Sequence, residues 1–171
     1  MERIPVRFEL NGVERRSWVW PHQTLLHTLR DELGATEVKY GCGEGVCGTC
    51  AVLVDGESLN SCLLFAVQAD GRRITTVRGL ADGEGELDAL QESFLRLGAS
   101  QCGYCTPGML LIAHEFVGEN PAPSREEIRE AIAGNLCRCT GYTKIIDAIE
   151  EYAAARATAE PGRLPRGGSD A

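Results

Sequence analysis

The amino-acid sequence predicts an α+β protein with a strand-rich first half and a helical second half. Hydrophobic and polar residues alternate along much of the first half, whereas beyond residues 81–85 hydrophobic residues recur about every 3.6 positions, the period of an amphipathic helix. Cysteines divide in the same way, with four before residue 81 and four after residue 85. The sequence therefore predicts two structural units, each with its own set of thiols.

Strand patterns dominate the first half. Asn11-Gly12 and Asp55-Gly56 are tight-turn signals, and each joins two extended segments into a predicted hairpin. Four leucines at helical spacing predict a short helix at residues 25–33, which Gly34 can end in a left-handed conformation. The predicted strands are residues 4–10, 13–20, 51–54, 57–61 and 73–77.

Helical patterns fill the second half, and four short helices at this spacing can share a core as a small bundle. Hydrophobic spacing predicts the first helix at residues 87–97 and the last around residues 145–152. Thr106 is expected to cap the second helix, with Pro107 at its first position. Ser124-Arg125-Glu126-Glu127 forms a capping box that opens the third.

The acidic, glycine-containing stretch at residues 81–85 marks the predicted domain boundary. It separates a first domain at 1–80 from a helical domain at 86–157. The remaining segment, 158–171, is rich in Ala, Gly, Pro and Arg without periodicity, which predicts a mobile or partner-binding tail.

Composition excludes several classes of function. The 171 residues are 43% hydrophobic with a formal net charge of −8, so the basic face that nucleic-acid phosphates require is not expected. The longest uninterrupted apolar stretch, residues 62–67, is far shorter than the roughly 18 residues of a membrane span. The first residues show neither a signal core nor a twin-arginine start, so we expect a cytoplasmic protein unless an exported partner carries it.

The first four cysteines have the spacing of a plant-type ferredoxin loop. Cys42, Cys47 and Cys50 form a C-x4-C-x2-C pattern, and Cys62 follows a predicted hairpin. The glycines of this loop permit the backbone angles that aim N–H groups at sulfur. A zinc ribbon is the alternative, but it usually pairs two short CxxC-like knuckles, which these residues do not form. The spacing therefore predicts a [2Fe–2S] cluster held by these four thiolates.

The other cysteines form a CxxC pair, Cys102 and Cys105, and a CxC pair, Cys137 and Cys139. By itself this pattern fits zinc, a redox disulfide or an iron–sulfur cluster. Both pairs precede predicted helices, whose positive N-terminal ends would stabilise a negatively charged centre. A purely disulfide framework is not expected, because about 5% Cys is below the roughly 8–10% of small disulfide scaffolds. The spacing leaves a second [2Fe–2S] cluster and a zinc site both open.

Other residues with chemical potential are expected to have ordinary roles. Two complete sets of four thiolates need no further ligand, so the histidines are expected in solvent or in the core. The tryptophans are expected to pack or to contact a partner, and the tyrosines to pack around the cysteines. These residues are His22, His27, His114, Trp18, Trp20, Tyr40, Tyr104 and Tyr142.

Three segments carry a family resemblance: GCGEGVCGTC at residues 41–50, QCGYCTPGM at 101–109 and NLCRCTGY at 135–142. Together they resemble the iron–sulfur subunit of the molybdenum hydroxylases, a family that includes xanthine dehydrogenases, aldehyde oxidoreductases, aerobic carbon monoxide dehydrogenases and N-heterocycle hydroxylases. The likeness runs from about Ile4 to Ala157 and includes every cysteine. Thr49 departs from the expected Ala or Ser, a small change that does not threaten the cluster.

The resemblance implies an N-terminal β-grasp, ferredoxin-like domain followed by a C-terminal four-helix domain, each holding one [2Fe–2S] cluster. The second cluster would be held by the CxxC and CxC pairs. Gln101 and Cys139 would contact a molybdenum–pterin cofactor on a large partner subunit. Electrons would pass singly from that cofactor through both clusters to FAD on a medium subunit, so no substrate chemistry is expected on this chain.

The same resemblance implies a dimer of heterotrimers. The flavin and molybdenum domains are expected on separate chains, because 171 residues leave no room for them. The substrate would be an N-heterocycle or a purine, otherwise an aldehyde or carbon monoxide. Two other functions remain open: a free ferredoxin-like electron carrier, which leaves the helical half unexplained, and a zinc-binding interaction module.

Overall fold

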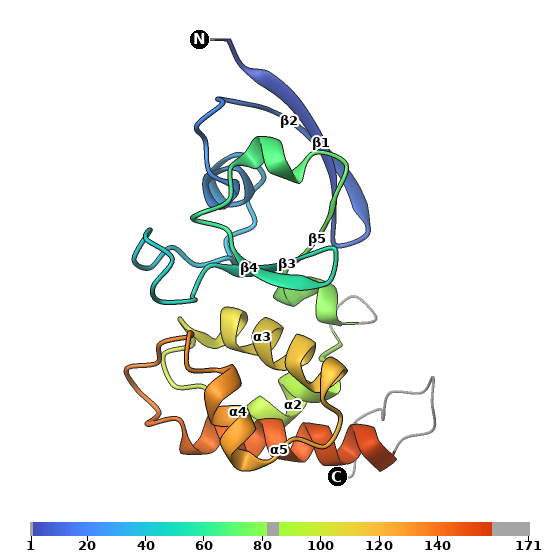
Figure 1. The fold of residues 1–171 in the computed structure, drawn as a ribbon, viewed down its shortest axis with the longest axis vertical. Coiled ribbons are helices and arrows are strands. Elements are labelled where there is room, and N and C mark those ends of the chain that lie inside the picture. Colours follow the sequence, from blue (N-terminus) through green and yellow to red (C-terminus); the bar gives the residue numbers. More distant parts are fainter. Residues whose placement is uncertain (1, 82–85, 159–171) are drawn as a thin grey trace.

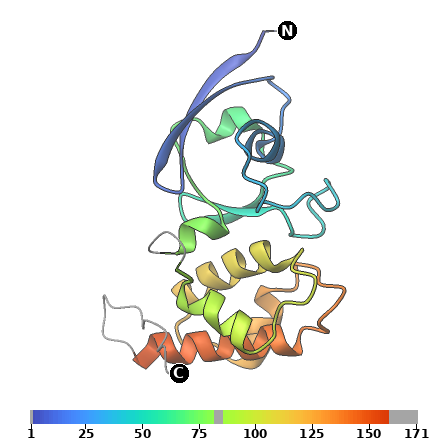
Figure 2. The same ribbon diagram turned by 180° about the vertical axis from the view of Figure 1, so that it is seen from behind.

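The computed structural model describes residues 2–81 and 86–158, which form two groups of elements stacked along the long axis of the molecule (Figure 1). Strands form one group and the longer helices the other, and the view from behind shows the same separation (Figure 2). The predicted boundary at residues 82–85 lies outside the described residues, as does the predicted tail except for Thr158. The division into domains at 1–80 and 86–157 stays a prediction, supported by two separate clusters of buried side chains.

A mixed five-stranded sheet forms the first group, in the order β2-β1-β5-β3-β4. β1 and β5 are parallel, and the other neighbouring strands are antiparallel. Both predicted hairpins are confirmed, and positive φ angles at Asn11-Gly12 and Asp55-Gly56 give the turns that such hairpins favour. The strands are β1 (Ile4–Leu10), β2 (Val13–Val19), β3 (Ala51–Val54), β4 (Glu57–Asn60) and β5 (Arg73–Thr75).

The predicted leucine-rich helix covers one face of this sheet. It begins as α1 (Leu25–His27) and continues with the wider π-helical turn η1 (Thr28–Glu32). Its buried leucines share a core with side chains of β1, and Gly34 follows it with the expected positive φ. Two 3₁₀ turns complete this group: η2 (Ala66–Ala69) and η3 (Val77–Leu80).

Four helices form the second group within the described residues. Ser124 and Glu127 make the predicted capping box. Ile145 and Ile149 are buried on the last helix, as their spacing predicts. The helices are α2 (Ala89–Arg96), α3 (Thr106–Glu119), α4 (Arg125–Ala131) and α5 (Thr143–Thr158).

The predicted cap of α3 is wrong by one residue. Cys105 occupies the N-cap position, and Thr106 is the first helical residue. The Thr106 hydroxyl donates to Ser100 Oγ at 3.0 Å rather than capping the helix. A side-chain cap needs an extended backbone, whereas the chain already has helical angles at Cys105 (φ −80°, ψ −18°). The helix therefore begins at a cysteine whose thiol remains free for other contacts.

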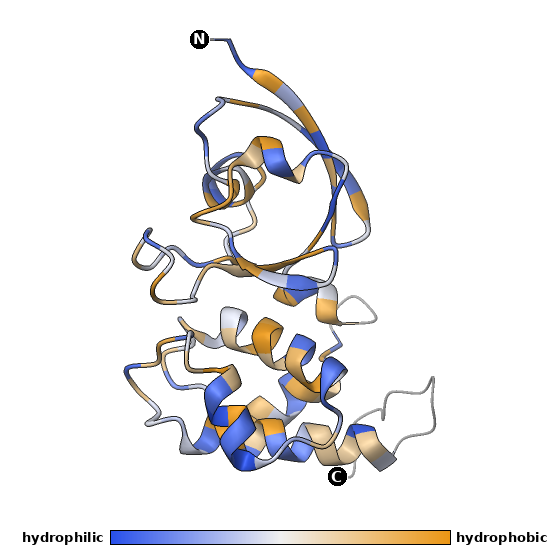
Figure 3. Ribbon diagram, in the orientation of Figure 1, coloured by the Kyte–Doolittle hydropathy of each residue, from blue (hydrophilic) through white to orange (hydrophobic). Residues whose placement is uncertain are grey.

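Helix α3 lies between the sheet and the other helices (Figure 1). Much of its length is hydrophobic (Figure 3), as expected for a helix packed on more than one side. Leu53 of β3 is part of the helical core, and Glu115 Oε1 accepts the Ser58 backbone N–H at 3.0 Å. These contacts hold α3 against the β3–β4 hairpin.

None of the helices in the described ranges, 2–81 and 86–158, is long and apolar enough to cross a membrane.

His114 is a partly buried histidine on α3. Its Nδ1 atom is buried with no hydrogen-bond partner in the described part of the chain. Burial, followed by the charge of Arg156, lowers the pKa of His114 below its ordinary value of 6.5. The folded state therefore binds this proton less readily than the unfolded state, so stability falls as the pH drops through about 6.5.

We predict that His114→Gln reduces the loss of stability between pH 7 and pH 5, because glutamine has no proton to gain in that range. Urea unfolding midpoints at the two pH values measure the effect. His22→Gln, at an exposed histidine, is the matched control for the loss of a histidine. An unaltered slope in His114→Gln would contradict the role of this side chain.

Candidate metal centres

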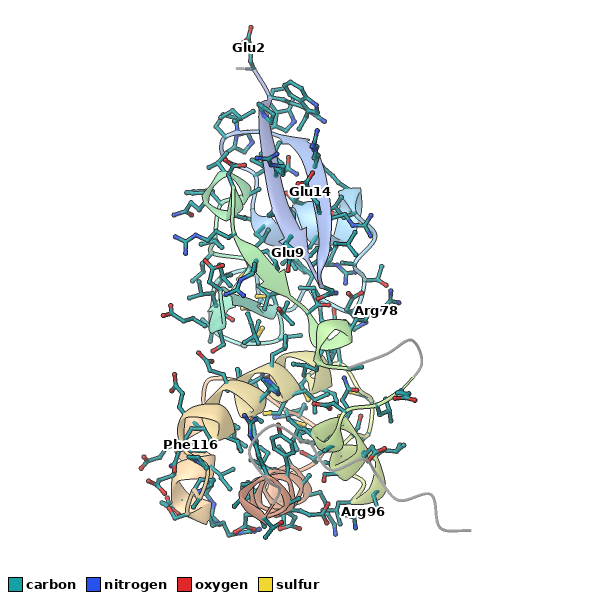
Figure 4. The ribbon with its side chains drawn as sticks, turned by 90° about the vertical axis from the view of Figure 1, so that its right-hand side faces the viewer. Glu2, Glu9, Glu14, Arg78, Arg96 and Phe116 are labelled. Atoms are coloured by element: carbon teal, nitrogen blue, oxygen red, sulfur yellow. The ribbon has the colours of Figure 1, made fainter. Side chains whose placement is uncertain are left out.

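All eight cysteines are free thiols. The four in the first half flank β3 and β4, and the four in the second half lie before α3 and α5. Sulfur atoms are present on both sides of the junction between the two halves (Figure 4). The fold thus brings the cysteines together in the two sets that the sequence predicts, and no disulfide competes for them.

Backbone amides surround the sulfur atoms at the start of the first set. Cys42 Sγ accepts N–H groups of Glu44 and Val46, both at 3.3 Å, and of Cys47 at 3.4 Å. Cys47 Sγ in turn accepts the Cys42 N–H at 3.3 Å. Hydrogen bonds from Glu44, then from Cys47, lower the pKa of the Cys42 thiol to about 6. The loop is thus arranged to stabilise negative charge on sulfur.

Glycines make this arrangement possible in two ways. Gly43 and Gly45 have φ angles of 74° and 75°, a region that residues with a Cβ rarely adopt. Gly41 has no such angle, but a Cβ there would lie 2.6 Å from Cys47 Sγ. The predicted need for glycine in this loop therefore has a conformational cause at some positions and a steric cause at another.

Cys50 and Cys62 complete the first set from the two ends of the β3–β4 hairpin. Both are buried, and their thiols are hydrogen-bonded to each other. Burial raises the pKa of the Cys62 thiol to about 11. Asn60 supports this pair: its Oδ1 accepts from Cys50 Sγ at 3.8 Å and its Nδ2 donates to the Gly45 carbonyl at 3.1 Å. The sequence analysis does not single out Asn60, because an asparagine at the end of a strand is common and its partners are brought to it only by the fold.

The second set also consists of two sulfur pairs. Cys139 Sγ lies 3.5 Å from Cys102 Sγ, and both residues are exposed. The Cys105 thiol is hydrogen-bonded to that of Cys137, and burial raises the pKa of Cys105 to about 12. Each pair therefore takes one residue from the CxxC segment and one from the CxC segment. Cys105 lies at the N-terminal end of α3, as expected.

Tyr142 holds the CxC segment in place. Its hydroxyl accepts the Cys137 N–H at 2.8 Å and donates to the Asn135 carbonyl at 3.4 Å. Its φ angle of 68° is unusual for an aromatic residue and indicates local strain. Tyr142 thus does more than pack around the cysteines. Tyr104 and Tyr40 join the two halves, because the Tyr104 hydroxyl donates a hydrogen bond to the Tyr40 carbonyl.

The arrangement of the sulfur atoms matches a binuclear core. A [2Fe–2S] core distributes four thiolates over two irons, and the second set consists of two sulfur pairs. A zinc site, the alternative, needs its ligands around one tetrahedral point.

Gln101 and Cys139, the two residues expected to contact a cofactor on a partner, are both exposed. His22 and His27 are also exposed, and no histidine in the described part of the chain joins either cysteine set.

Comparison with known proteins identifies two domain families along the chain. Residues 8–81 match the 2Fe-2S iron-sulfur cluster binding domain, and residues 76–150 match the [2Fe-2S] binding domain. The second cysteine set, for which the spacing left zinc open, therefore lies in a [2Fe–2S]-binding domain. The predicted fold class, a β-grasp ferredoxin-like domain followed by a helical [2Fe–2S]-binding domain, is confirmed.

Similar proteins extend over most of the chain. The nicotinate dehydrogenase small FeS subunit of Eubacterium barkeri is 47% identical over 156 residues, covering 91% of this chain and 98% of that subunit. The nicotine 6-hydroxylase small subunit of Paenarthrobacter nicotinovorans is 47% identical over 148 residues, with coverages of 86% and 88%.

A solved structure agrees with these relatives. Quinoline 2-oxidoreductase from Pseudomonas putida 86 contains a chain that superposes with a TM-score of 0.87 at 51% sequence identity, covering 92% of this chain and 96% of that one. The two domain matches, the relatives and the shared fold lead to one conclusion: this chain belongs to the iron–sulfur subunit family of the molybdenum hydroxylases, a family of multi-subunit oxidoreductases.

Proposed function

We propose that this chain is the electron-transfer subunit of a molybdenum hydroxylase. It would connect a molybdenum–pterin cofactor on a large subunit with FAD on a medium subunit, in a dimer of heterotrimers. Its own residues perform no substrate chemistry. A bound [2Fe–2S] cluster accepts and releases one electron at a time, which divides a two-electron oxidation into single transfers.

The single observation that carries this proposal is that eight free thiols gather in two sets of four. The first cluster would be held by Cys42, Cys47, Cys50 and Cys62, and the second by Cys102, Cys105, Cys137 and Cys139. Loop amides, the hairpin and the start of α3 position these thiols.

The two sets differ in how the chain surrounds them. Backbone N–H groups point at Cys42 Sγ, whereas Cys137 Sγ lies 3.1 Å from the Thr140 hydroxyl oxygen. Hydrogen bonds to sulfur and exposure to solvent both tune the potential of an iron–sulfur centre. We therefore expect two centres with different potentials and different spectroscopic signals.

Exposed groups beside each set support a role between two partners. Near the first set, Val46, Leu63 and Phe65 leave large apolar side chains in solvent, which is typical of an interface. We propose that this side faces the FAD subunit. Gln101 and Cys139 are exposed beside the second set, and we propose that they contact the molybdenum–pterin cofactor of the large subunit.

We further propose an aromatic N-heterocycle as the substrate of the complex. The support comes from the relatives, whose names refer to nicotinate, nicotine and quinoline. A purine, an aldehyde or carbon monoxide is the alternative, since relatives also include a xanthine dehydrogenase subunit of Escherichia coli O157:H7 and an aldehyde oxidoreductase of Megalodesulfovibrio gigas.

Metal and sulfide analysis of the purified chain tests the proposal. We predict about four iron atoms and about four labile sulfides per chain, two of each for every [2Fe–2S] core, and two distinct paramagnetic signals after reduction. Cys62→Ser and Cys105→Ser are each expected to remove one signal and leave the other. Zinc in either set, or one signal from the unaltered chain, would contradict the two-cluster assignment.

Isolation of the chain with its partners tests the role in a complex. A permanent interface buries more than roughly 2,000 Å² and survives purification. Recovery with a flavin subunit and a molybdenum subunit supports the proposed function. A chain that purifies alone and still accepts and releases electrons would indicate a free ferredoxin-like carrier.

Gly41→Ala tests the first ligand set without changing a ligand. The added methyl would overlap Cys47 Sγ, so we predict loss of the first cluster and retention of the second, about half of the total iron. Gly118→Ala is the control, because a Cβ at Gly118 meets no atom within 4 Å. Full iron content and both signals in Gly41→Ala would argue against Cys47 as a ligand.

A further inference from the structure

The two cysteine sets meet at a buried contact between the first cysteine loop and the CxC segment. The Leu136 N–H donates to the Cys47 carbonyl at 2.9 Å. Beside it, Asn135 Nδ2 donates to the Gly48 carbonyl at 3.3 Å. Together with Gly108 of α3, these residues form a contact that we call the inter-set seam.

The seam is packed too closely for any side chain at its two glycines. A Cβ on Gly48 would lie 2.5 Å from the Gly134 carbonyl oxygen and 2.8 Å from Asn135 Cα. A Cβ on Gly108 would lie 2.6 Å from the Gly48 carbonyl oxygen and 2.7 Å from Asn135 Nδ2. The backbones of the loop, the helix and the CxC segment therefore touch directly.

Asn135 is the polar side chain at the centre of the seam. It is fully buried, and its Oδ1 atom has no hydrogen-bond partner in the described part of the chain. A buried polar atom without a partner is unfavourable, so folding stability alone would favour an apolar residue of similar size. What the amide provides is its Nδ2 donor, which ties the CxC segment to the loop of the other set.

The backbone of Asn135 is linked to the second cysteine set as well. The Tyr142 hydroxyl donates to the Asn135 carbonyl while it accepts the Cys137 N–H. A shift of Asn135 would therefore move the segment that carries Cys137 relative to the loop that carries Cys47. The Asn135 amide is therefore one of the contacts that set the separation of the two sets.

The seam also provides a direct bonded connection between ligands of the two sets. Cys137 is covalently joined to Leu136, whose N–H is hydrogen-bonded to the carbonyl of Cys47. Of the other hydrogen bonds between the halves, that from Ser58 to Glu115 involves no neighbour of a cysteine, and that from Tyr104 to Tyr40 joins the neighbour of Cys105 to a residue two positions before Cys42. The Leu136–Cys47 hydrogen bond of the seam thus connects Cys47, a proposed ligand of the first set, with the residue next to Cys137, a proposed ligand of the second set.

We propose that Asn135 is a positioning residue that sets the electronic coupling between the two cysteine sets across the Leu136–Cys47 hydrogen bond. The proposal rests on the proposed function, because it assumes that both sets hold iron. An iron centre held by the set that includes Cys137 would give up one electron and be oxidised, and an iron centre held by the set that includes Cys47 would accept that electron and be reduced. No covalent bond changes, and no further reactant is required.

Asn135→Leu and Gly108→Ala test the seam in the full chain. The first removes the amide donor at similar volume, and the second adds a methyl that would separate α3 from Gly48. Gly118→Ala is the matched control on the same helix, where a Cβ meets nothing within 4 Å. None of these substitutions alters a cysteine.

The readout is the magnetic splitting that each fully reduced centre causes in the signal of the other, measured at low temperature beside iron content. We expect a smaller splitting in Asn135→Leu and Gly108→Ala at unchanged iron content, and the wild-type splitting in Gly118→Ala. If Asn135→Leu does not fold, the comparison of Gly108→Ala with Gly118→Ala decides the question.

Two results would overturn the inference while the proposed function stands. One is full iron content with unchanged splitting in both seam variants, and the other is two signals without any splitting in the wild-type chain. Failure of the proposed function itself has a different signature, since a wild-type chain that binds zinc or no metal would fail the metal analysis before any variant is compared.

Discussion

Close contact between backbones at Gly48, Gly108 and Asn135 is the constraint on which the arrangement of the two halves depends. A side chain at either glycine would collide with main-chain atoms of the opposing segment, and main chain can yield much less than a flexible side chain. Helix α3 reaches this point because it packs against the sheet on one side and the other helices on the other. The cysteine sets are therefore neighbours because of packing that involves few of the cysteines themselves.

The two sets show two ways of preparing thiols for a metal core. The first relies on a loop whose N–H groups point at sulfur, an arrangement that a glycine-rich backbone allows. The second relies on side-chain hydroxyls and a helix start, with Tyr142 holding the Cys137 amide and Thr140 close to its sulfur. Burial raises the pKa of Cys62 and Cys105.

Local patterns predicted much of this structure. The turn signals at Asn11-Gly12 and Asp55-Gly56, the capping box at Ser124 and the apolar spacing of α5 all lie where short-range rules place them. The N-cap of α3 was less predictable. A capping residue needs an extended backbone, whereas the backbone is already helical at Cys105, so Thr106 lies inside the helix and cannot cap it. Asn60 and Asn135 were not identified in advance, since their partners are brought to them only by the fold.

The sequence by itself determined the cysteine spacing, the hairpins, the helices and the family. Each of these depends on residues close together in the chain or on the order of the cysteine motifs along it. Only the tertiary structure decided which cysteine lies beside which, and how the two sets meet. Cys102 is beside Cys139 rather than its own neighbour in sequence, and Leu136 bonds to Cys47 across the two halves. Such contacts follow from the packing of α3 and from the absence of a Cβ at Gly48, neither of which spacing along the chain can reveal.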